Sequence, residues 1–209
     1  MNSYYTKDQL HKLGFKSLGD NVLLSKKASI YNAENISIAN NVRIDDFVIL
    51  SGYIDIGSFV HISTGSVLMS KEEGIILEDY SCVSIQCKVL GSSDDFTGEA
   101  LVGPCIPLQY RHITSKPIIL KKYSLLGCNS IILPGGNLAE GVSVGAASLI
   151  LRPTKAWGIY FGTPAKRIAE RSKNLLKLEE EFSALGGGAD KLKSSLSSIS
   201  LLFSIQKSA

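Results

Sequence analysis

Aliphatic residues recur at every sixth position through most of this chain. One series reads Ile38, Ile44, Leu50, Ile56, Ile62 and Leu68, then Leu77, Val83 and Val89, and after a gap Leu120, Leu126, Ile132, Leu138, Val144 and Ile150. A second series lies four positions later and reads Val42, Val48, Ile54, Val60 and Ser66, then Ser124, Ser130, Gly136, Val142 and Ser148. This period matches neither the 3.6-residue turn of an α-helix nor the two-residue alternation of a strand.

A six-residue period predicts short strands joined by corners, with both series pointing inward. Three such units close a triangular coil of about eighteen residues, and coils stack at about 4.8 Å through parallel ladders. The alternative is a set of parallel strands in an α/β protein, which needs helical crossovers that do not fit between Ile38 and Leu68. We therefore predict an all-β fold, a parallel β-helix. Glycines after the leading aliphatics, such as Gly57, Gly127 and Gly145, are expected to supply unusual corner dihedral angles.

The segments around the repeat divide the chain. Residues 1–17 are expected to form an N-terminal cap, because Thr6 and Gln9 make the capping-box pattern of a short helix. The β-helix is expected over residues 18–162, with a short insertion at 70–74 and a protruding loop at 91–117. A loop of that length is usually functional.

The C-terminal part departs from the six-residue pattern. Thr163 and Pro164 suit the N-cap and first turn of a helix, which we expect over residues 163–186, from about Ala165 to Leu185. The Ser-rich residues 187–209 are expected to be a flexible tail, with docking as a weak amphipathic helix as the alternative.

Composition and charge narrow the class of protein. Aromatic residues make up only 8% of the chain, so the core must be aliphatic. A net charge of +3 argues against nucleic-acid binding, which usually needs a concentrated basic surface. The four cysteines form no C-x-x-C pair, and neither a signal peptide nor a transmembrane segment is recognisable. We expect a cytoplasmic protein with reduced thiols.

Three late motifs resemble one family. Residues 126–135 (LGCNSIILPG), 144–148 (VGAAS) and 162–168 (GTPAKRI) are similar to the last coils and closing motif of hexapeptide-repeat acetyltransferases. Residues 94–99 (DDFTGE) and 157–160 (WGIY) resemble the galactoside and O-antigen sugar O-acetyltransferases in particular. Related enzymes N-acetylate nucleotide-linked amino sugars. The resemblance covers roughly residues 3–185 and implies that the β-helix is left-handed.

The resemblance also implies an activity. It points to a homotrimer with clefts between neighbouring solenoids, acetyl-CoA as co-substrate, and a sugar or nucleotide-sugar acceptor in bacterial surface-polysaccharide (O-antigen, capsule or lipopolysaccharide) biosynthesis. O-acetylation is the favoured reaction. The alternatives are N-acetylation of a nucleotide-linked 4-amino-dideoxy sugar and a non-catalytic scaffold. No metal is expected, because a zinc enzyme on this fold needs three converging histidines and His11 lies in the cap.

Acetyl transfer needs a group that takes the acceptor's proton. Where galactoside-type enzymes have a histidine, at the start of the long loop, this chain has Ser93, Asp94 and Asp95. His61, within a matching Val-His-Ile segment, and His112, near the loop's end, are the candidate bases, with a surface role as the alternative for each. Asp94 and Asp95 are candidates to bind the sugar or orient an imidazole, or else to form a turn.

The expected cofactor-binding residues lie in the last coils. By resemblance, Cys128 and Ala146 line the channel for pantetheine. Lys166 and Arg167 open the expected terminal helix, whose N-terminus favours anions, and Arg152 lies nearby. These three cations are the candidate ligands of the CoA phosphates.

Overall fold

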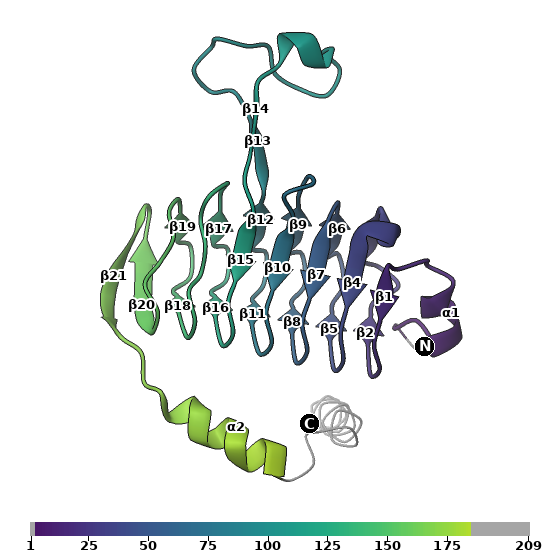
Figure 1. The fold of residues 1–209 in the computed structure, drawn as a ribbon, viewed down its shortest axis with the longest axis vertical. Coiled ribbons are helices and arrows are strands. Elements are labelled where there is room, and N and C mark those ends of the chain that lie inside the picture. Colours follow the sequence, from purple (N-terminus) through teal and green to yellow (C-terminus); the bar gives the residue numbers. More distant parts are fainter. Residues whose placement is uncertain (1–2, 185–209) are drawn as a thin grey trace, which may run out of the picture. The chain divides into compact units, whose positions relative to one another are not determined.

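The computed structural model describes residues 3–184. It comprises two compact units, one ending at Arg171 and the other beginning at Ser172. The first is a left-handed parallel β-helix in which short strands stack coil upon coil into three faces (Figure 1). The predicted fold class is therefore confirmed.

Each face of the solenoid is one sheet, named here in chain order. The first face consists of β1 (Ser17–Leu18), β4 (Ile36–Ile38), β7 (Ile54–Ile56), β10 (Ile75–Leu77) and β15 (Ile118–Leu120). The second consists of β2 (Leu23–Leu24), β5 (Arg43–Ile44), β8 (His61–Ile62), β11 (Cys82–Val83), β16 (Leu125–Leu126), β18 (Ser143–Val144), β20 (Gly158–Gly162) and β21 (Ala165–Glu170). The third consists of β3 (Ser29–Tyr31), β6 (Ile49–Ser51), β9 (Val67–Met69), β12 (Lys88–Leu90), β17 (Ile131–Ile132) and β19 (Leu149–Ile150).

The core is made of the two aliphatic series read from the sequence, and all their members are buried. The strand register places each aliphatic side chain over the equivalent aliphatic side chain of the next coil. Ile56, for example, pairs with Ile38 on one side and with Leu77 on the other. Three serines of the second series, Ser66, Ser130 and Ser148, are buried with their hydroxyls hydrogen-bonded to backbone groups, whereas the buried Ser124 Oγ has no hydrogen-bond partner among the described residues. Ser130 Oγ donates to Gly145 O at 2.9 Å and accepts from Ser148 N at 3.1 Å.

The regular spacing of small residues after the leading aliphatics has a different cause from the expected one. Gly57, Gly127 and Gly145 do not adopt positive φ, so the dihedral argument was wrong. Close stacking of the coils requires them instead, because a Cβ on Gly127 would lie 2.4 Å from Val144 O. Left-handed corners fall two positions after each of these glycines, at Phe59, Asn129 and Ala147.

A short helix closes the start of the solenoid. In α1 (Lys7–His11), Thr6 Oγ1 accepts from Gln9 N at 3.3 Å and Gln9 Oε1 accepts from Thr6 N at 3.0 Å, which is the expected capping box. Leu10 is 4% exposed and packs into the core. A turn of 3-10 helix, η1 (Ala33–Asn35), marks the first corner insertion.

The long insertion leaves the solenoid after β12. It begins and ends with an antiparallel pair, β13 (Ser92–Asp94) and β14 (Ile113–Ser115), and carries a 3-10 turn, η2 (Leu108–Tyr110). Figure 1 shows this hairpin projecting from the body with its loop at the far end.

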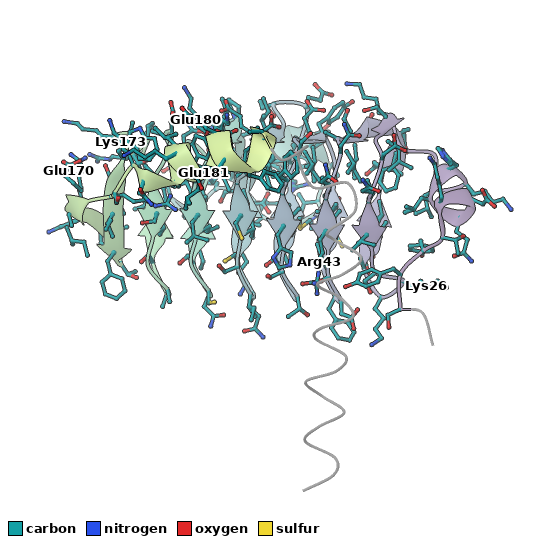
Figure 2. The ribbon with its side chains drawn as sticks, turned by 90° about the horizontal axis from the view of Figure 1, so that it is seen from below. Lys26, Arg43, Glu170, Lys173, Glu180 and Glu181 are labelled. Carbon is teal, nitrogen blue, oxygen red and sulfur yellow. The ribbon has the colours of Figure 1, made fainter. Side chains whose placement is uncertain are left out.

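The prediction of a helix over residues 163–186 was wrong for the first half of that range. Residues 165–170 instead form β21, which pairs antiparallel with β20 around a turn where Thr163 Oγ1 donates to Ala147 O. Without β21, β20 would be an open edge, and its pairing overrides the helical propensity of this segment. The helix α2 (Asn174–Ala184) belongs to the second unit, and Glu180 and Glu181 project from it (Figure 2). Residues 185–209, including the expected tail, lie outside the described residues.

Candidate active site

Asp94 ends β13 at the base of the projecting loop. Its Oδ1 accepts from Arg111 Nη2 at 2.7 Å, and its Oδ2 accepts from Gly103 N at 3.3 Å. The Arg111 guanidinium lowers the pKa of Asp94 below its usual range. Since the side chain is still 32% exposed, Asp94 presents an ionised carboxylate that a cationic or hydroxyl-bearing ligand can reach.

Asp95 holds the loop in shape. Its carboxylate accepts from Thr97 N and Oγ1, and from the backbone N–H groups of Gly98, Glu99 and Ala100. Hydrogen bonds from Thr97 are the main cause of its pKa of about 2. These contacts favour the turn-forming role for Asp95 over contact with a sugar.

His61 lies on the outer face of β8, in register with Arg43 below and Cys82 above. Its Nε2 is 2.8 Å from Asp45 Oδ2, and Arg43 Nε donates to the other Asp45 oxygen at 2.7 Å. Arg43 projects from the outside of the solenoid (Figure 2). The hydrogen bond to Asp45 raises the pKa of His61 to about 9. At neutral pH the imidazole is therefore protonated, which disfavours the role of base.

The other histidines are on different elements. His112 is exposed and lies between η2 and β14, on the projecting loop. His11 is exposed at the end of α1, as its position in the cap predicted. The two candidate bases thus come from a solenoid face and from the loop.

A cavity of about 390 Å³ lies at the end of the solenoid. Both Arg152 and Lys166 line it, together with Leu149, Ile150, Leu151, Pro153, Thr154, Tyr160, Pro164 and Ala165. Two of the three expected phosphate ligands are therefore brought together over an apolar floor, an arrangement suited to an anionic group attached to an apolar one.

Arg167 is not part of that cavity. It pairs with Tyr160 across the β20–β21 hairpin, and its Nη2 donates to Glu170 Oε2 at 2.8 Å and Ala156 O at 3.3 Å. Neighbouring residues of a strand point to opposite sides, so Lys166 and Arg167 diverge. Because both lie in β21 and not at a helix start, the expected contribution of helix N–H groups to phosphate binding was wrong.

Cys128 and Ala146 lie on adjacent coils at the corner that follows the second face, where Ala147 N donates to Cys128 O at 2.8 Å. Ala146 is exposed and Cys128 is half-buried. Cys87 lies beneath them with its Sγ donating to Gly127 O, and burial raises its pKa to about 11. The small side chains at this corner, including Cys128 and Ala146, leave a surface along which an extended ligand can bind.

Sequence reasoning missed Arg111 and Asp45. Arg111 directly precedes the candidate base His112 in the sequence. An arginine inside a long functional loop that also carries Asp94 was the available signal. Asp45 directly follows the inward-facing Ile44. Nothing in the sequence around it indicated that its side chain would bond to His61 and Arg43.

Among residues 3–184, no group of three histidines, cysteines or carboxylates gathers closely enough to hold a metal ion. No helix of the same stretch has the length and apolar character needed to span a bilayer.

Known proteins match nearly the whole chain. It is 41% identical over 189 residues to dTDP-4-amino-4,6-dideoxy-D-glucose acyltransferase of Escherichia coli, covering 88% of this chain and 98% of that protein. No family model matches the sequence.

Solved structures give the same result. AntD, an N-acyltransferase from Bacillus cereus, in complex with dTDP and 3-hydroxybutyryl-CoA, is 46% identical with a TM-score of 0.87, over 90% of this chain and all of that one. An S84A variant of AntD, in complex with dTDP-4-amino-4,6-dideoxyglucose and coenzyme A, has the same TM-score and 47% identity, covering 88% of this chain and 99% of that one. Variants of AntD at its position 94 have also been crystallised.

This similarity extends over the repeats, the projecting loop and the closing hairpin alike, since it covers nearly the full length of each relative. The chain therefore belongs to the hexapeptide-repeat, left-handed β-helix acyltransferases, in the group that includes the dTDP-4-amino-4,6-dideoxy-D-glucose acyltransferase of Escherichia coli.

Proposed function

We propose that this acyltransferase moves an acyl group from a CoA thioester to the 4-amino group of a dTDP-linked 4-amino-4,6-dideoxy sugar. The observation that carries the proposal is the full-length similarity to an enzyme of that name and to AntD, which binds that nucleotide sugar and coenzyme A. The expectation of O-acetylation gives way to its amine alternative, because both relatives are named for, or bound to, an amino sugar.

The ionised carboxylate of Asp94 suits an amine acceptor. A primary amine is mainly an ammonium ion at neutral pH, and a carboxylate with free lone pairs attracts and orients it. The ammonium ion first loses one proton to solvent, and the neutral amine then attacks the thioester carbonyl. The C–N bond forms as the C–S bond breaks, and the second proton lost from nitrogen ends on the thiolate, so that CoA leaves as a thiol.

Acyl-CoA is proposed to bind along the last coils. Arg152 and Lys166 would hold CoA phosphates at the terminal cavity, and Cys128 and Ala146 would line the path of pantetheine. Arg167, committed to Glu170, is the weakest of the proposed ligands. Acetyl-CoA is the proposed donor, with 3-hydroxybutyryl-CoA as the second donor to assay because AntD binds it. A homotrimer would complete each cleft with a neighbouring solenoid.

Neither histidine is proposed as the main base. His61 already carries a proton at neutral pH, and His112 lies on the exposed part of the loop. The reaction tolerates this, because the ammonium ion is always in equilibrium with a minor neutral fraction of the amine, which can attack without a strong base.

The test is a direct assay of acceptor and product. Purified protein is incubated with acetyl-CoA or 3-hydroxybutyryl-CoA and either dTDP-4-amino-4,6-dideoxy-D-glucose or dTDP-glucose, and thiol release and product mass are followed. We expect acylation of the amino sugar only, with an amide that resists hydroxylamine. Acylation of dTDP-glucose at a comparable rate would restore the O-acetylation hypothesis. An Asp94→Asn variant should lower kcat/KM for the amino sugar while leaving dTDP binding unchanged.

A further inference from the structure

We infer that Arg111 is a positioning residue, which fixes the Asp94 carboxylate where the amino sugar's ammonium group can meet it. The inference rests on the proposed role of Asp94, and it assigns Arg111 a function that acts only through that carboxylate.

Arg111 approaches Asp94 from the returning side of the loop, two residues before β14. It follows η2, and its backbone forms a bridge with Leu101 that closes the loop upon itself. Its Nη2 then donates to Asp94 Oδ1 at 2.7 Å, across 17 residues of sequence. At 12% exposure its side chain is nearly enclosed, whereas Asp94 is 32% exposed. The cation is therefore fixed within the loop, and the carboxylate is the member of the pair that faces outward.

The partners of Asp94 leave room for a ligand. A carboxylate can accept about four hydrogen bonds, and the described contacts use one on each oxygen, from Arg111 and Gly103 N. A second, more distant cation is Lys71, in the turn before β10, and the ionised Asp95 lies next in the chain. Arg111 is thus the only charged side chain that the described contacts place in direct hydrogen bonding with Asp94.

The geometry of arginine matters for this role. Guanidinium is planar and stays charged, so it holds a carboxylate in one orientation, whereas an ammonium group is a point charge on a flexible stem. Arg111 also keeps Asp94 ionised, because it lowers the pKa of that carboxyl. Both effects act on the binding of an amine and on nothing else in the proposed reaction.

A double-mutant cycle tests the inference in the full-length protein. Arg111→Gln, Arg111→Lys, Asp94→Asn and the double variant Asp94→Asn/Arg111→Gln are compared, with Lys7→Gln as the control. Lys7 forms a single ion pair with Asp20 on the exposed surface beside the N-terminal helix, outside the proposed site. The readouts are kcat/KM for the amino sugar, KM for acyl-CoA, and the Kd of dTDP, which lacks the amine.

We expect Arg111→Gln to lower kcat/KM for the amino sugar by about ten- to a hundredfold, as loss of a charge-assisted contact implies. KM for acyl-CoA and the Kd of dTDP should change less than about twofold, and Arg111→Lys should recover part of the loss. The double variant should be no slower than Asp94→Asn, because residues that act through one group are not additive.

Three results would overturn the inference. Multiplicative losses in the double variant would mean that Arg111 acts independently of Asp94. A parallel loss of dTDP binding in Arg111→Gln and Arg111→Lys would mean that Arg111 only supports the loop. Full activity of Asp94→Asn would remove Asp94 from the site and Arg111 with it, whereas failure of the wild-type protein to acylate the amino sugar would instead refute the proposed function.

Discussion

The contact between His61 and Asp45 makes stability depend on pH in a predictable direction. The pKa of His61 is raised from 6.5 to about 9, so the folded protein holds a proton that the unfolded chain releases. The resulting stabilisation is fully present below pH 6.5 and is lost as pH rises through 9. Each tenfold change in proton affinity corresponds to about 1.4 kcal/mol, so the rise of the His61 pKa from 6.5 to about 9 sets an upper limit of about 3.5 kcal/mol.

The exposed fraction of the side chain reduces that limit. The His61 side chain is 39% exposed, so solvent screens the pair, and we expect about 1 kcal/mol. For a chain of this size, that corresponds to a fall in Tm of about 2–4 °C between pH 6.5 and 9.5. The assay is thermal unfolding at several pH values for the wild-type protein and His61→Gln. The variant should lose this pH-dependent component.

Parallel curves for the two proteins would refute the reasoning, because the ion pair would then contribute nothing. The same variant tests the chemistry. Since His61 is already protonated at neutral pH, His61→Gln should keep acyl transfer within a few-fold of wild type at pH 7.5. A loss of several hundredfold with intact CoA binding would restore His61 as the base.

Two further changes probe the solenoid and the cofactor end. Gly127→Ala places a Cβ against Val144 O and should destabilise the protein by about 1–3 kcal/mol, measured as a lower Tm; an unchanged Tm would show that the coils can separate. Lys166→Ala should raise the Kd for CoA about tenfold in calorimetry, with no effect on rates with an acyl-pantetheine donor, which lacks the phosphates. Equal losses with both donors would contradict phosphate binding.

The sequence by itself determined the fold. The six-residue aliphatic period identified both inward-facing series, from Ile38 to Ile150, and all of these residues are buried. The prediction of the core succeeded because every coil of a solenoid repeats the same local environment. An aliphatic residue at an inward position of one coil therefore indicates a buried residue at the same position of the next. The capping box at Thr6 was readable for the same reason, since the atoms that satisfy it lie within a few residues.

Only the tertiary structure decided the remaining features. Residues 165–170 form a strand because β20 offers unpaired backbone groups, which local propensity cannot reveal. Gly127 is needed because the next coil passes within van der Waals contact, and that coil is 17 or more residues away in sequence. Arg111 meets Asp94, and His61 meets Asp45, through contacts that the fold creates between distant segments. Charged residues do not recur at a regular spacing in this sequence. Their partners, and therefore the direction of their pKa shifts, are known only once the folded structure shows which segments lie side by side.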